Sequence, residues 1–216
     1  FLIILLPISF IAGNLIINLN LMLIIIFSLL FYGKEIFQIK LFFFDKLLIF
    51  IFLFCIFTSI VNTYLFQNNT PNNIDTLTIK KTFSFLRFLF FYFTLRFLVE
   101  KKIFNFKFFF ISAAACSIFV SIDLIYQFIN GRDVFGFSPT SYKLSGPFGD
   151  EEIAGSYLQR FSVFSFFLVS IYFTKLPKER KFLIFFSLIL LFFYSVFLAG
   201  NRMPIILFML FWILLF

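Results

Sequence analysis

The sequence predicts an all-α protein, a polytopic bundle of transmembrane helices. Hydrophobic residues make up 62% of the chain and charged residues 13%, and the mean hydropathy is +1.06. A water-soluble domain of 216 residues has too little interior to bury so many apolar side chains. The apolar residues also form runs close to the length of about 20 residues that a helix needs to cross a bilayer. Short polar segments with turn-forming residues separate these runs.

About eight apolar runs are long enough to suggest spanning helices, and those at the two ends look truncated. We expect them at 1–13, 16–33, 46–66, 78–98, 107–129, 153–173, 181–200 and 203–216. Residues 1–216 are therefore treated as a single transmembrane domain. Because the chain opens on Phe1 and ends inside an apolar run, we expect it to be a fragment of a longer chain.

The placement of Lys and Arg predicts the orientation in the membrane. These residues concentrate in alternate polar segments, around 34–46, 96–107 and 175–181, whereas "QNNTPNNID" at 67–75 has none. Short cytoplasmic loops of membrane proteins carry an excess of Lys and Arg. We therefore expect a cytoplasmic N-terminus and an extracytoplasmic loop at 130–152. The same rule explains the net charge of +8 without nucleic acid as a partner.

The composition also narrows the possible chemistry. The chain has no histidine, which is the commonest general base and metal ligand in proteins. Cys55 and Cys116 both lie inside apolar runs, where a cysteine is typically a small buried side chain. Neither a disulfide nor a metal site is indicated. We expect the protein to need no metal and no other cofactor.

Three ionisable residues fall inside the predicted spans: Arg87, Asp123 and Arg160. A charge at the centre of a spanning helix costs about 2.5–3.5 kcal/mol on insertion scales, so such residues usually face the bundle interior or a water-filled cavity. At about 1.5 Å per residue, each lies roughly 9–13 Å below the outer end of its helix. This common depth predicts a polar chamber that opens to the outside. The alternatives are an ion pair of Arg87 or Arg160 with Asp123, or arginines that reach toward the interface.

"KLSGPFGDEEIAGSYLQR", residues 143–160, interrupts the apolar pattern. Its Gly- and Pro-rich part at 145–149 is typical of a turn. Asp150 is then expected to cap the next helix, with Glu151 and Glu152 in the first turn, where the helix dipole favours negative charge. The functional alternative is that these carboxylates contact sugar hydroxyls or serve as a base for an acceptor hydroxyl.

Two stretches together resemble the O-antigen ligase/polymerase family of bacterial envelopes. The first is "YKLSGPFGDEEIAGSYLQRF", and the second, about 40 residues later, is "FLAGNRMPIILFML". In that family an extracytoplasmic loop with a basic residue and an "SG.FG" turn leads into a helix that begins with small residues. A later span ends in Gly or Ser, a polar residue and Arg, a pattern that Gly200-Asn201-Arg202 matches. Residues 181–216 would then begin the ligase-like core.

This resemblance implies a metal-independent membrane glycosyltransferase of the GT-C type in the bacterial inner membrane. Such an enzyme takes a glycan from an undecaprenyl diphosphate carrier at the periplasmic face. It joins the glycan to lipid A-core or to another carrier-linked repeat. A larger extracytoplasmic loop with further Arg and a His would follow the region seen here. Membrane lipid and these two glycan substrates are the expected partners.

Arginine suits a diphosphate because its planar guanidinium keeps its charge and offers paired donors. Arg202 is our first candidate, since it stands at a helix end that faces outward. The expected catalytic residues are Arg202 and Arg160, and the expected substrate-binding residues are Arg87, Lys143, Arg132, Asp150, Glu151 and Glu152.

Two other functions fit part of the sequence. A transporter or flippase for a polyprenyl-linked glycan would also need outward-facing cations, but it should show broken helices and repeat symmetry between halves. A non-catalytic membrane scaffold would explain the hydrophobicity but not the 143–160 segment. The sequence after residue 216 would separate these alternatives, because the enzyme predicts a large hydrophilic loop and the transporter a second set of spans.

Overall fold

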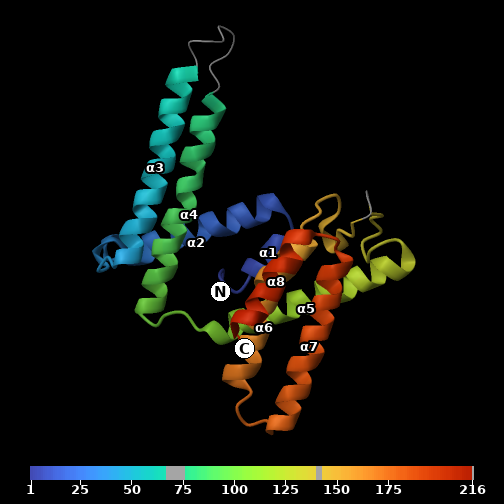
Figure 1. Ribbon diagram of the computed structural model, residues 1–216. Coiled ribbons are helices and arrows are strands. Elements are labelled where there is room, and N and C mark those ends of the chain that lie inside the picture. The colour runs from blue at the N-terminus through green and yellow to red at the C-terminus, as the bar shows by residue number, and fades with distance from the viewer. Residues whose placement is uncertain (67–75, 140–142, 216) are drawn as a thin grey trace. The chain divides into compact units, whose positions relative to one another are not determined.

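The computed structural model describes residues 1–66, 76–139 and 143–215, and every element in these ranges is a helix (Figure 1). The all-α prediction is therefore confirmed. Five helices are long and apolar enough to cross a membrane: Asn14–Ile36, Phe43–Thr63, Ile79–Glu100, Phe106–Asn130 and Lys178–Leu198. They are compatible with a multi-pass membrane protein. The predicted outer loop at 67–75 lies outside the described residues.

The expected number of about eight spans is not confirmed. The run at 1–13 contains only the six-residue helix α1 (Leu6–Ile11), and the run at 203–216 contains the 14-residue helix α8 (Arg202–Leu215). Helix α6 (Ala154–Tyr172) has 19 residues but is not among the five. Its serines, Gln159 and Arg160 lower its mean hydropathy, and about half of its side chains are buried by neighbouring helices.

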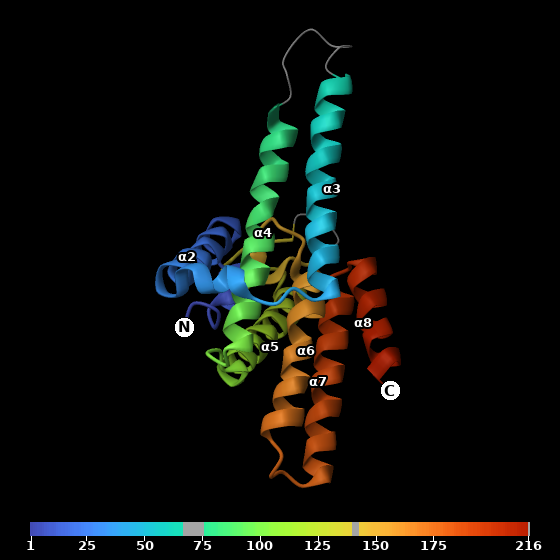
Figure 2. The same cartoon turned by 90° about the vertical axis from the view of Figure 1, so that its left-hand side faces the viewer.

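The chain folds into two compact units, which we describe separately. The first unit comprises Phe1–Ile17 and Asn105–Phe216, and the second comprises Asn18–Phe104. The second unit contains most of α2 (Asn14–Tyr32), the 3-10 helix η1 (Gly33–Gln38), α3 (Phe43–Phe66) and α4 (Thr76–Glu100). Helices α3 and α4 lie side by side in both views (Figures 1 and 2).

A buried polar network joins α3 to α4 within the second unit. Asp45, in the first turn of α3, forms an ion pair with Arg96 of α4 and accepts a 2.7 Å hydrogen bond from the Tyr92 hydroxyl. Arg96 also donates to the carbonyl oxygen of Lys40 at 2.7 Å. Asp45 is only 1% exposed. The predicted spans left Asp45 just outside the span at 46–66 and put Arg96 near the end of the span at 78–98, whereas the structure places both within helices and pairs them.

In the first unit, α6 is the central helix. It packs against α5 (Phe106–Asn130), α7 (Lys178–Leu198), α8 and the short 3-10 helix η3 (Gly146–Phe148), and α1 packs on α5 (Figure 2). The fully buried core side chains come from all four long helices of this unit: Val120, Leu124, Leu158, Phe192, Val196 and Phe208. This packing fixes the start of α6 against the ends of its neighbours.

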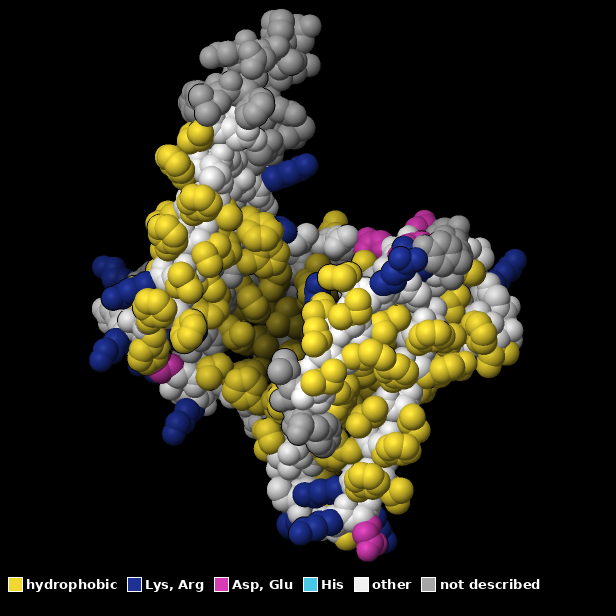
Figure 3. Space-filling model, viewed as in Figure 1, with side chains coloured by type: hydrophobic (Ala, Val, Ile, Leu, Met, Phe, Trp, Pro, Cys, Tyr) yellow, Lys and Arg dark blue, Asp and Glu magenta, His cyan; other side chains and the backbone are white. Residues whose placement is uncertain are grey.

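Charged residues gather at the ends of the first unit's helices. Figure 3 shows hydrophobic side chains along the side of α7 and Lys and Arg side chains at the α6–α7 turn. The cations of this turn are Lys175, Lys178, Arg180 and Lys181. Apolar sides with charged ends are the arrangement expected of helices surrounded by lipid.

Candidate functional site

The two stretches that carry the family resemblance meet at the start of α6. Gly155 of α6 faces the α7–α8 turn so closely that a Cβ atom there would lie 3.3 Å from the Cβ of Ala199. The same atom would lie 3.4 Å from the Cβ and Nδ2 of Asn201. The small residue in "IAGSYL" therefore has a clear role, since it lets the two segments touch.

Polar contacts reinforce this junction. The Lys143 ammonium lies 2.6 Å from Oε2 of Glu152, and Nδ2 of Asn201 donates to the carbonyl oxygen of Glu152 at 2.9 Å. Gly200 has a φ of +71° and carries no side chain where the Lys143 stem crosses it, so a Cβ would lie 3.2 Å from Cγ of Lys143. Glycine meets both requirements at this turn without strain.

These residues enclose a small polar pocket of about 330 Å³. We call it the polar pocket, and its lining residues are Lys143, Glu152, Ser156, Gly200, Asn201, Arg202, Met203 and Pro204. Arg202 is exposed and is the first residue of α8, so its guanidinium stands beside the positive end of that helix dipole. An exposed arginine at a helix N-terminus favours the binding of an anion.

The expected helix cap at Asp150 is wrong. Helix α6 begins at Ala154 with Ile153 as its N-cap residue, and its first turn contains no acidic residue. The acidic residues are used elsewhere, since Glu152 contacts Lys143 and Asn201, and Oε1 of Glu151 accepts a 2.8 Å hydrogen bond from Asn14. Asp150, Glu151 and Glu152 therefore precede the helix and do not form its first turn.

The hydrogen bond that the structure gives Asp123 comes from the backbone of a loop and not from an arginine. Its Oδ1 accepts a 2.8 Å hydrogen bond from the backbone N–H of Val134. One turn further along α5, Oε1 of Gln127 accepts a 2.9 Å bond from the backbone N–H of Gly146. Both acceptors are almost fully buried. Together they hold the backbone at Val134 and Gly146 against α5, and Gly146 lies between the pocket residues Lys143 and Glu152. The sequence shows that Gln127 follows Asp123 by four residues, but it did not predict that Gln127 binds the backbone of Gly146.

The predicted basic residues are only partly brought together. Arg202 and Lys143 line the polar pocket, as does Glu152. Arg160 is exposed on α6, one turn beyond the pocket residue Ser156, and is not among the lining residues. Arg132 is exposed just after Gly131, which ends α5, and also lies outside the lining, as do Asp150 and Glu151.

Arg87 belongs to the second unit. It is half-buried on α4, and its guanidinium carbon lies 4.9 Å from the centre of the Phe88 ring. This cation–π contact offers a local reason for its position in an apolar helix.

Ser156 and Asn201 also line the polar pocket. The sequence marked both, Ser156 by its spacing of four residues from Glu152 and Arg160, and Asn201 as part of the Gly-Asn-Arg pattern, but neither was among the predicted site residues. No protein-family model, curated protein or solved structure matches this chain.

Proposed function

We propose that the protein is a membrane glycosyltransferase of the O-antigen ligase/polymerase type. It transfers a glycan from undecaprenyl diphosphate to lipid A-core or to another carrier-linked repeat. The observation that carries this proposal is the junction of 143–160 with 197–210. These two stretches alone resemble the family, and in the fold they share one pocket and a close glycine contact.

The polar pocket suits a diphosphate leaving group. In the transfer, the acceptor hydroxyl oxygen bonds to the anomeric carbon while the bond from that carbon to the diphosphate oxygen breaks. The departing diphosphate gains negative charge, which Arg202 can stabilise with two parallel N–H donors. Ser156 and Asn201 offer further polar contacts beside it.

Glu152 is our candidate for the group that accepts the proton of the acceptor hydroxyl. Glu152 lines the pocket, and its Oε2 lies 2.6 Å from Nζ of Lys143. An ionised carboxylate within reach of a hydroxyl can serve as a general base. Arg160 lies one helical turn from Ser156, where it can contact a glycan that extends beyond the pocket.

We place the protein in the bacterial inner membrane with this pocket at the periplasmic face, and the charge distribution supports that orientation. The α6–α7 turn holds four cations, and the polar pocket lies at the other end of α6 and α7. A cation-rich turn faces the cytoplasm in most membrane proteins. The pocket would then face outward, where carrier-linked glycans are joined.

The transporter alternative has less support in this structure. Transport by this class of protein predicts helices that are broken near the middle of the membrane. Helices α3, α4, α5 and α7 are each continuous between their bounds. A scaffold, for its part, would need neither the polar pocket nor its arginine.

A reconstituted transfer assay tests the proposal. The product of the complete gene would be placed in liposomes with an undecaprenyl diphosphate-linked glycan and a lipid acceptor. We expect Arg202→Ala to abolish transfer and Arg202→Lys to restore part of it. Arg180→Ala, at the far end of the same unit, serves as the matched control and should transfer normally. Normal transfer by both Arg202→Ala and Arg160→Ala would refute the proposal.

A further inference from the structure

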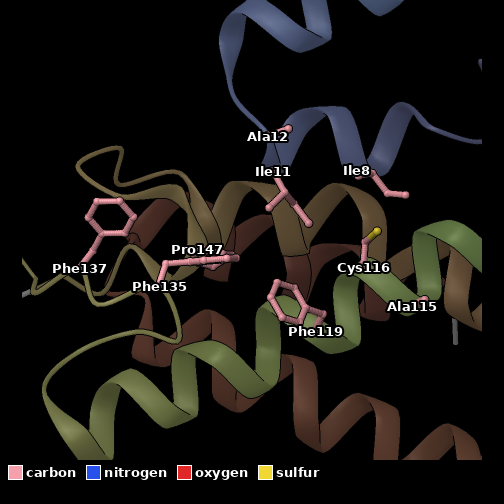
Figure 4. A pocket seen from close by; sticks show the side chains of 9 residues that line it. All are labelled: Ile8, Ile11, Ala12, Ala115, Cys116, Phe119, Phe135, Phe137 and Pro147. Carbon is pink, nitrogen blue, oxygen red and sulfur yellow. The ribbon is translucent and has the colours of Figure 1, made fainter.

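A second and larger pocket lies in the first unit, and its lining is apolar. It has a volume of about 740 Å³ and is formed by α1, α5, η3, and Phe135 and Phe137 of the segment after α5. Figure 4 shows Ile11 pointing from α1 toward Phe119 of α5, with Cys116 beside it and Pro147 near one end of the hollow. We call this the apolar pocket. Its size falls within the range of about 300–1,000 Å³ that is usual for small-molecule sites.

The two pockets are close because one segment lines both. Pro147 belongs to the apolar pocket, and Lys143, only four residues earlier, belongs to the polar pocket. Four residues span at most about 14 Å even when fully extended. The pockets are therefore neighbours within the same unit, whatever path the chain takes between them.

Hydrogen bonds hold the walls of the apolar pocket to the segments around the polar pocket. The hydroxyl of Tyr157, on α6, donates to the carbonyl oxygen of Pro7 in α1 at 3.0 Å, and this contact is buried. Asn14, which follows α1, donates to Glu151 at 2.8 Å. Helix α1 is thus fixed to the start of α6, which also carries the pocket residue Ser156. The two pockets are therefore built on segments that are hydrogen-bonded to one another, one pocket lined by cations and the other apolar.

We propose that the apolar pocket binds the isoprenoid chain of the carrier, in the part next to its diphosphate. This inference rests on the proposed function, because the diphosphate would occupy the polar pocket. A phosphorylated isoprenoid has one anionic head and one hydrocarbon chain, which matches one polar pocket beside one apolar pocket. Because the chain already lies in hydrocarbon, close van der Waals packing against the pocket wall is what would favour this position over bulk lipid. The chain would leave the pocket toward the surrounding lipid.

A photolabelling experiment tests this site. The protein would be placed in phosphatidylcholine nanodiscs with a prenyl diphosphate that carries a benzophenone on its chain. We expect adducts on the peptides that contain Ile11 and Cys116. Ala115→Trp and Ala12→Trp fill the pocket from opposite walls, and each should lower this labelling about tenfold, equivalent to about 1.4 kcal/mol. Leu190→Trp, exposed on α7 and away from the pocket, is the control and should label normally.

The head group is tested in the same preparation. We expect inorganic diphosphate to compete with the probe and Arg202→Ala to weaken its binding. If both do so but the adducts spread over the lipid-facing helices, or if neither tryptophan variant changes them, the apolar pocket does not hold the chain and the proposed function stands. If the adducts lie in the pocket but inorganic diphosphate and Arg202→Ala have no effect, the pocket takes hydrocarbon of another source. That result would overturn both proposals. Two filling variants on separate walls ensure that misfolding of one does not decide the outcome.

Discussion

Gly155 offers the sharpest test of the junction between the two signature stretches. An added Cβ would lie 3.3 Å from Ala199 and 3.4 Å from Asn201, so the neighbours would have to move by a few tenths of an ångström. In Gly155→Ala this cost is offset by a gain of about 1 kcal/mol in helix propensity, and we expect little change in stability. Gly155→Leu adds three more carbons against the same wall. Ala199 is fully buried and cannot yield, so we expect a loss of about 1–3 kcal/mol from overpacking.

The assay is unfolding of the purified protein in detergent, followed by circular dichroism over temperature. Ser170→Leu provides the matched control, because Ser170 lies on the same helix but is exposed. The leucine at position 155 should also displace Asn201 from Glu152 and so weaken diphosphate binding, which the control should not do. If Gly155→Leu is as stable as Ser170→Leu, the two stretches do not pack as described, and the polar pocket loses its basis.

Three further predictions concern single contacts. Arg96→Ala leaves the buried Asp45 carboxylate without its cationic partner and should cost about 3–5 kcal/mol in chemical unfolding, whereas Asp45→Asn should cost less. Gln127→Leu removes the acceptor of the Gly146 N–H, which should cost about 1–3 kcal/mol and speed hydrogen exchange at residues 144–149. Glu152→Gln removes a negative charge beside the pocket arginine, so isothermal titration should show tighter binding of inorganic diphosphate, while transfer should fall because the proposed base is lost.

A different experimental result would contradict each of these three predictions. An Arg96→Ala protein with unchanged stability would mean that the ion pair contributes nothing to the α3–α4 hairpin. Unchanged exchange at 144–149 in Gln127→Leu would show that the loop is held by other contacts. For Glu152→Gln, weaker diphosphate binding would assign the carboxylate a role in organising the pocket, and normal transfer would remove it as the base.

Part of the candidate site was visible in the sequence because its residues depart from a strong background. In a chain that is 62% hydrophobic, the polar segment 143–160 and the Gly-Asn-Arg turn at 200–202 stand out at once. Lys143, Glu152 and Arg202 were predicted from these segments and do line one pocket. Gln127 could not be predicted, because its role depends on a backbone N–H that lies 19 residues away in the chain.

The burial of the central helix, α6, was also not predicted from the sequence. Helix α6 reads as another spanning segment, but its polar residues place it below the five most apolar helices. Its neighbours α5, α7 and α8 cover much of it, so Ser162 and Ser165 are buried against protein. Hydropathy reports the average environment of a segment and does not reveal which helix lies inside a bundle.

The amino-acid sequence by itself determined that this chain is helical and apolar, because water cannot solvate so much hydrocarbon and lipid leaves the backbone only its own hydrogen bonds. Where the helices break follows from the same local chemistry of glycine, proline and charge. Only the tertiary structure decided which charges meet. Asp45 forms an ion pair with Arg96, Asp123 accepts a hydrogen bond from a loop backbone, and the Lys143 side chain packs on Gly200. Such pairings depend on the close approach of helices that are distant in the sequence, and side-chain packing alone fixes that approach.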